Sequence, residues 1–311
     1  MSRPARGLTL VQKAILQWRV GSLSQSLEAS AEAVAIFRRT GNKGHEAYAL
    51  NALGVCLYSS GAYEDAIAVI RASILLDREA GDRMHLGRKT SNIGQMYADL
   101  GDVTRAKEFL QRALDVFESL DDLAGRGDTL AAMAELLVEQ VGDLPAAASA
   151  LDSARTIAER LGDPYDLAHE RMVRAALHAA QGDHAASEQA ARSAVAHART
   201  AAAAGYELLA CAMRAKALAQ LGRTDEAREI ARDVQSGVRM RGVVERAQRV
   251  HLELADALAL AGDADGALRA RADALAIVET QLTQIRDPQL RERYLATRLV
   301  QSIRAELGAQ P

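Results

Sequence analysis

Side chains that could catalyse a reaction or bind a metal are scattered along this sequence of 311 residues. A zinc protease needs two histidines one helical turn apart with a glutamate between them, and a structural zinc site needs closely spaced cysteines or histidines. Neither pattern occurs, and we interpret the histidines as solvated or groove-lining side chains. The histidines and cysteines are His45, His85, His169, His178, His184, His197, His251, Cys56 and Cys211.

Motifs for phosphate binding and for nucleophilic catalysis are also absent from the sequence. We find no P-loop pattern GxxxxGK[ST], no glycine-rich kinase loop and no GxSxG. We therefore expect a chain that is not an enzyme and needs no cofactor or metal. The two cysteines are interpreted as small core residues, and so few thiols favour a reducing, cytoplasmic location.

Composition narrows the class of protein further. Basic and acidic residues number 38 and 41, a balance that argues against nucleic-acid binding. No run of 18 apolar residues could span a membrane, and Met1–Leu10 lacks the apolar core of a signal peptide. Ala, Leu, Arg and Glu are abundant while prolines number only five, so the chain is expected to be all-α.

Glycine recurs along the chain with a nearly constant period. The spacing is 40 residues at every step except from Gly101 to Gly142, where it is 41. A second set of turns falls halfway between these positions, and the weakest join is at Ala201–Ala204. The chain is thus divided about every 20 residues, which predicts helices of roughly 14–17 residues joined by short turns. The periodic glycines are Gly21, Gly61, Gly101, Gly142, Gly182, Gly222 and Gly262; the halfway turns are at Gly41, Gly81, Asp121, Gly162 and Gly242.

The residue types at these turns explain how each helix ends and the next begins. Glycine accepts the left-handed conformation after the last helical residue, and a following Asp can cap the next helix. We interpret these aspartates as caps and not as metal ligands. The Gly-Asp pairs are at 81–82, 101–102, 142–143, 162–163, 182–183 and 262–263.

The repeating unit resembles the tetratricopeptide repeat, which has a small residue early in its first helix, a glycine at the turn and an alanine five residues later. One unit carries Gly54, Gly61 and Ala66, and the next carries Gly94, Gly101 and Ala106. The period of about 40 is similar to the extended class found in LGN-like scaffold proteins and their bacterial relatives. The resemblance implies an all-α, right-handed superhelical solenoid of about seven antiparallel helix pairs over residues 1–285. The expected units are 1–41, 42–81, 82–121, 122–162, 163–202, 203–242 and 243–282.

The two ends of the chain depart from the repeat. Residues 286–311 begin with Asp287-Pro288 and then show one apolar stripe, which predicts a single amphipathic capping helix. The Asp-Pro-x-Leu-Arg pattern also resembles the end of large bacterial regulators in which a Ser/Thr kinase or an ATPase precedes the repeats. No capping segment precedes Ala14, so the chain is expected to be a fragment or its first helix to pack on something else. Trp18 is interpreted as a packing residue, with a docking surface as the alternative.

The concave face of such a solenoid is formed by the first helix of each pair, and its polar residues are the candidate binding site. Amide side chains can hydrogen bond to an extended peptide backbone, arginine can bind a carboxylate, and tyrosine offers apolar contact with a polar tip. The Lys/Asn clamp of chaperone-binding repeats is incomplete here. The candidate groove residues are Tyr48, Asn51, Tyr58, Arg88, Ser91, Asn92, Gln95, Asp99, His169, Met172, Arg214, Lys216, Arg249 and Asp256.

The functional hypothesis is a scaffold or sensor module whose groove binds a protein or peptide. The alternative is a non-catalytic regulatory region of a larger bacterial Ser/Thr kinase or ATPase. A peptide-sensing transcription regulator is a weaker possibility, because residues 1–20 are too short for a helix-turn-helix. The expected partner is a protein or peptide, not a nucleic acid or a membrane, and the oligomeric state stays open.

Overall fold

The structure is a computed structural model that describes residues 3–81, 85–241 and 245–305. Within these ranges the regular structure is helical throughout, as the composition predicts. The helices of the first four units are α1 (Arg3–Arg19), α2 (Leu23–Thr40), α3 (Lys43–Ser59), α4 (Tyr63–Ala80), α5 (Leu86–Asp99), α6 (Val103–Ser119), α7 (Leu123–Leu136), the π-helix η1 (Leu137–Val141) and α8 (Leu144–Leu161). The rest are α9 (Pro164–Ala180), α10 (His184–Thr200), α11 (Ala204–Gln220), α12 (Thr224–Arg241), α13 (Ala247–Leu260), α14 (Ala264–Gln284), α15 (Pro288–Ala296) and α16 (Arg298–Ala305).

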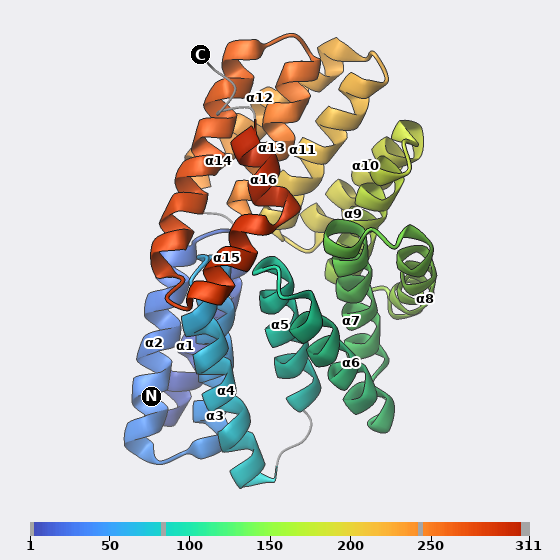
Figure 1. The fold of residues 1–311 in the computed structure, drawn as a ribbon. Helices are drawn as coiled ribbons and strands as arrows, with labels where there is room; N and C mark the ends of the chain where they lie inside the picture. The colour runs from blue at the N-terminus through green and yellow to red at the C-terminus, as the bar shows by residue number, and fades with distance from the viewer. Residues whose placement is uncertain (1–2, 82–84, 242–244, 306–311) are drawn as a thin grey trace.

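Consecutive helices pack as hairpins, and the hairpins stack side by side into a curved solenoid (Figure 1). Each odd-numbered helix from α1 to α13 also contacts the next odd-numbered helix, so these helices form one continuous layer. This arrangement confirms the predicted all-α solenoid of helix pairs. None of the described helices is long and apolar enough to cross a membrane.

The turns have the predicted chemistry. Gly101, Gly142, Gly162, Gly182 and Gly262 all have positive φ. The aspartate after each of these glycines accepts a backbone N–H at the start of the next helix, which confirms the capping role. Two predicted features, the cap at Asp82 and the turn at Gly242, lie outside the described residues.

The join that lacks glycine keeps the same backbone shape. Ala202 takes the left-handed conformation, with φ of 53°, and the other described non-glycine residues with positive φ are Asp121 and Arg246. A Cβ in this region clashes with the following carbonyl oxygen at a cost of about 1–2 kcal/mol. The repeat geometry is therefore held at Ala202 although the side chain opposes it.

The single 41-residue spacing has a structural counterpart in the fourth unit. The last turn of its first helix is η1, a π-helix that ends at Gly142. A π-turn accommodates an extra residue in an otherwise α-helical segment. The extra residue therefore widens the end of this helix and leaves the stacking of the hairpins unchanged.

Helix pairs pack most closely where a glycine faces a bulky side chain. A Cβ added at Gly54 would lie 2.4 Å from Cγ1 of Ile70, and one added at Gly94 would lie 2.8 Å from Cγ of Leu110. Both distances are too short for carbon atoms, so only glycine fits. The small positions of the repeat thus set the spacing between paired helices.

The C-terminal segment differs from the expected single capping helix. It forms two short helices, α15 and α16, separated at Thr297, which adopts extended backbone angles. The Thr297 hydroxyl donates to the carbonyl of Tyr294 and accepts the N–H of Val300, so the side chain ends one helix and begins the next. The break redirects α16 so that Val300 and Ile303 are buried in the core.

The same segment closes the curve of the solenoid, because it packs against the second and third units (Figure 1). Arg286 forms ion pairs with Glu64 at 3.1 Å and Asp65 at 2.6 Å, and Arg293 pairs with Asp102. These contacts join residues more than 190 positions apart. The C-terminal segment therefore covers part of the inner layer of odd-numbered helices.

Candidate functional site

The centre of the inner layer holds a buried charge cluster. The carboxylate of Glu135, on α7, pairs with Arg246, with Arg249 at 2.9 Å and with His169 at 3.5 Å. Burial alone would raise the pKa of Glu135, but the arginines and His169 hold it well below its usual range. One carboxylate thus contacts three cationic groups, which come from α9, α13 and the turn before α13.

Arg246 reaches this cluster from an unusual backbone conformation. It lies immediately before α13 with φ of 56°, and its guanidinium contacts both carboxylate oxygens of Glu135. The two residues are 111 positions apart. The left-handed backbone directs this side chain across the inner face, and the bidentate pair joins the fourth unit to the seventh.

The π-turn places a second carboxylate beside the first. Glu139, in η1, pairs with Arg249, and the same arginine also contacts Glu135. Burial raises the pKa of Glu139 to about 7, because Arg249 only partly offsets the loss of water and the neighbouring Glu135 adds repulsion. On this side of the cluster two carboxylates therefore face two arginines.

His169 lies on the other side of the cluster, between two carboxylates. Its Nδ1 is 3.2 Å from Asp128 and its Nε2 is 3.5 Å from Glu135. Burial alone would lower the pKa of His169, but the hydrogen bond to Asp128 and the nearby charge of Glu135 outweigh it and raise the pKa to about 9. His169 is therefore a buried cation near neutral pH.

Tyrosines continue the polar lining toward the first units. The hydroxyl of Tyr58 donates to Asp99 at 2.8 Å. Burial raises the pKa of both groups, so neither the phenol nor the carboxyl group ionises as readily as it would in water. Asp99 also lines a small cavity with Gln95, Glu139 and Arg246.

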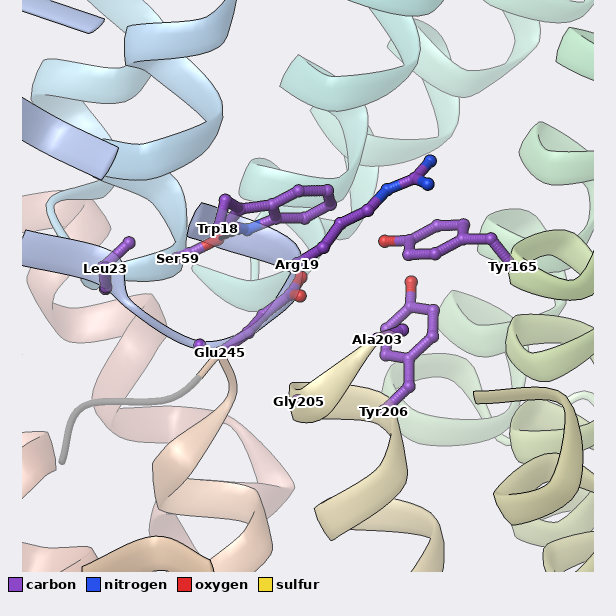
Figure 2. Close-up of a pocket in the computed structure, with 10 residues that line it drawn as sticks. Trp18, Arg19, Leu23, Ser59, Tyr165, Ala203, Gly205, Tyr206 and Glu245 are labelled. Atoms are coloured by element: carbon purple, nitrogen blue, oxygen red, sulfur yellow. Dashed lines mark hydrogen bonds between the residues drawn. The ribbon is translucent and has the colours of Figure 1, made fainter. Parts of the chain in front are cut away.

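An aromatic pocket adjoins the cluster where the end of α1 meets α9 and α11 (Figure 2). The rings of Trp18 and Tyr165 are 6.0 Å apart, and those of Tyr165 and Tyr206 are 4.9 Å apart and stacked. The indole N–H of Trp18 donates to Ser59 at 2.8 Å, and the carboxylate of Glu245 points into the pocket. The predicted packing role of Trp18 is confirmed, and the residue also lines a pocket.

The structure brings together only part of the predicted groove. Tyr58, Gln95, Asp99, His169 and Arg249 belong to the charge cluster or line its cavities. The others stand apart from it. Exposed or half-buried positions on α3 and α5 hold Arg88, Asn92, Asn51 and Tyr48. Lys216 and Asp256 pair with each other. Ser91 is buried against Thr129, and Met172 lies in the core.

Arg214 does not face the groove. It pairs with Glu188 on α10 at 2.8 Å and lines an outer cavity of about 360 Å³ with Cys211 and Val234. The side chain therefore lies on the α10 side of α11, away from the charge cluster.

Several central residues were missed in the sequence. Glu135 and Glu139 belong to the fourth unit, whose motif is loose, and Arg246 follows the seventh unit's opening turn. The 41-residue spacing was the one signal that pointed to the fourth unit. These side chains form a site only through contacts between different units. Such contacts produce no recurring pattern in the repeat sequence.

The described residues contain no group of three or more His, Cys, Asp or Glu side chains that could hold a metal ion. The carboxylates at the centre pair with guanidinium groups and with a protonated imidazole. Such an arrangement suits recognition of charged and polar groups. The fold and this lining define a helical-repeat binding scaffold, a class that uses its curved inner surface to hold partners.

Comparisons with known proteins identify the kind of repeat. The tetratricopeptide-repeat family matches residues 86–160. Residues 86–160 thus match the tetratricopeptide repeat, and the similar structures below share the fold of the chain. No curated protein matches the sequence.

Solved structures resemble the chain over nearly its whole length. A Rap protein in complex with competence and sporulation factor is 13% identical, with a TM-score of 0.61 over 99% of this chain and 100% of that one. NprR in complex with its cognate peptide NprX is 15% identical, with a TM-score of 0.60 over 100% of this chain and 89% of that one. The apo form of the quorum sensor NprR from B. thuringiensis is 12% identical, with a TM-score of 0.51 over 89% of each chain. At these identities the likeness establishes the shared fold.

Proposed function

We propose that this protein is a peptide sensor that binds an extended peptide against the inner layer of odd-numbered helices. The observation that carries the proposal is the convergence of polar and charged groups from α3, α5, α7, α9 and the start of α13 on one recessed face. The Rap and NprR structures of the same fold were solved with a factor or a peptide bound, which supports a peptide in preference to a large partner.

The edge of this face is suited to the peptide backbone. Arg88 is exposed on α5, and its charge acts on Asp128 of α7 and Asp166 of α9, so the three helices share one face. Asn92 is half-buried one turn further along α5, and Asn51 on α3 has a buried amide oxygen with no hydrogen-bond partner among the described residues. An amide with a free acceptor can receive a peptide N–H.

Selection of binders from a random heptapeptide library, followed by calorimetry, tests this function. The variant Arg88→Ala/Asn92→Ala should weaken the selected peptides at least about tenfold, equivalent to about 1.4 kcal/mol for the two lost polar contacts. Lys107→Ala/Arg112→Ala removes two exposed cations from the outer helix α6 and should leave affinity unchanged. Equal affinity for all three proteins would contradict the assignment of this face.

The regulatory-region alternative, with a kinase or ATPase elsewhere in a longer protein, stays a prediction. No residue described here favours it over the sensor function.

A further inference from the structure

The aromatic pocket beside the charge cluster has the composition of a site for an organic cation. Its walls include the rings of Trp18, Tyr165 and Tyr206, and Glu245 lines the same pocket (Figure 2). Aromatic faces attract cations through the ring quadrupole, by about 0.5–1 kcal/mol when exposed and about 2 kcal/mol when shielded from water. A carboxylate among such rings adds direct charge attraction and sets the orientation of the cation.

Glu245 is available for a ligand. It is half-buried, and no hydrogen bond or ion pair joins its carboxylate to another described residue. Burial raises its pKa, and the charges of Arg246 and His169 only partly oppose this effect. A desolvated carboxylate without a partner is unfavourable, so a cation that enters the pocket gains more from this group than from one in water.

The backbone beside Glu245 leaves little spare room. A Cβ added at Gly205 would lie 3.0 Å from Cβ of Glu245, so a larger residue there would press on the carboxylate side chain. The free space in the pocket is about 10 Å³, roughly one water molecule. The pocket is therefore nearly filled by its own walls in this structure.

One of those walls is itself a cation. The guanidinium of Arg19, at the end of α1, lies over the ring of Tyr165 with 5.5 Å between the guanidinium carbon and the ring centroid. The Arg19 side chain is otherwise exposed and makes no ion pair with Glu245 or another described acid. Arg19 thus contacts the aromatic part of the pocket and makes no ion pair with the carboxylate of Glu245.

We propose that this pocket binds the guanidinium or alkylammonium group of a ligand's basic side chain, and that Arg19 occupies its aromatic wall until the ligand displaces it. An incoming arginine that displaces Arg19 and enters the pocket can pair with Glu245, so it makes one strong contact that Arg19 does not. The proposal rests on the peptide-sensor function for the identity of the ligand, but the pocket can be tested without any peptide.

Trp18 is the only tryptophan of the chain, so its fluorescence reports on this pocket alone. The probes are N-acetyl-arginine amide and N-acetyl-citrulline amide, which have nearly the same shape but differ in charge. The arginine probe should change the Trp18 emission of the full chain, and citrulline should not. Arg19→Gln should bind the arginine probe about tenfold more tightly, because the internal cation no longer competes.

Variants of the walls separate the pocket from general electrostatics. Added to Arg19→Gln, either Glu245→Gln or Tyr165→Leu should weaken the arginine probe about tenfold, and Tyr165→Phe should retain binding because the ring is kept. Asp225→Asn removes one negative charge at a fully exposed position and should have no effect. Circular dichroism confirms that each variant is folded.

Two results would overturn the pocket: equal responses to arginine and citrulline, or an unchanged response to arginine after Glu245→Gln. Failure of the peptide function is a separate outcome. It would appear as an empty heptapeptide selection while the arginine probe still changes Trp18 emission and still depends on Glu245.

Discussion

Different interactions hold the paired helices together and join the units across the inner face. Between paired helices the contacts are apolar and close, as where Gly94 meets Leu110. Across the inner face the contacts are ionic, and Glu135 joins Arg246, Arg249 and His169. The first kind links residues within one repeat, and the second links the fourth unit to the fifth and to the seventh. The apolar contacts thus hold the helix pairs together, and the ionic contacts join units across the inner face.

The largest effect expected from this difference is in the charge cluster. Glu135→Ala should lower the free energy of unfolding by about 3–5 kcal/mol, because it leaves buried cations without their shared carboxylate. Urea denaturation followed by circular dichroism measures the change. The control is Glu108→Ala, which breaks an exposed pair with Arg112 on α6 and should leave stability nearly unchanged. Similar losses of unfolding free energy for the two variants would mean that the charge cluster does not stabilise the solenoid.

A smaller loss of stability is expected from a change at the contact between paired helices. Gly94→Leu should lower the free energy of unfolding by about 1–3 kcal/mol, since even its Cβ would lie 2.8 Å from Cγ of Leu110 and 3.1 Å from its backbone nitrogen. Gly44 is also helical, but nothing lies within 4 Å of an added Cβ. Gly44→Ala should therefore stabilise the chain by about 0.5–1 kcal/mol through helix propensity. Thermal melts of both variants would refute the packing register if their shifts had the same sign.

The contrast also explains how much the sequence could predict. The helices, their turns and the caps at residues such as Asp102 and Asp143 follow from local chemistry that recurs every 40 residues, so they were predictable. The partners of Glu135 were not, because Arg246 lies 111 positions away and follows no repeat position. The break at Thr297 was hidden for a related reason. The apolar stripe of the C-terminal segment continues through it, and only the side-chain hydrogen bonds of Thr297 reveal two helices.

The charge cluster should also make stability depend on pH. The folded-state pKa of His169, about 9, lies above the usual 6.5, so its charge contributes stability that is complete below pH 6.5 and lost as the pH rises toward 9. The pKa values of Glu139 and Asp166 are raised to about 7, so ionisation of these two carboxyl groups lowers stability in a lower window, as the pH rises from about 4 to 7. The melting temperature should therefore fall between pH 7 and 9.

Substitution of the histidine isolates this effect. His169→Gln should be less stable at pH 7 and should lose most of the decline between pH 7 and 9. His178→Gln, on the same helix α9 but outside the cluster, should keep the decline of the wild type. A decline of the same size in His169→Gln would mean that other groups produce it.

The smallest effect concerns the turns, which connect the helices and recur with the repeat. Ala202 and Gly222 both occupy left-handed positions, with φ of 53° and 76°. Ala202→Gly should stabilise the chain by about 0.5–1 kcal/mol, because relief of a Cβ clash of about 1–2 kcal/mol exceeds the extra backbone entropy of glycine. Gly222→Ala should destabilise it by a similar amount, since nothing within 4 Å of the added Cβ could compensate. If Ala202→Gly left the melting temperature unchanged or lowered it, the join would not be strained, and the missing glycine would cost the repeat nothing.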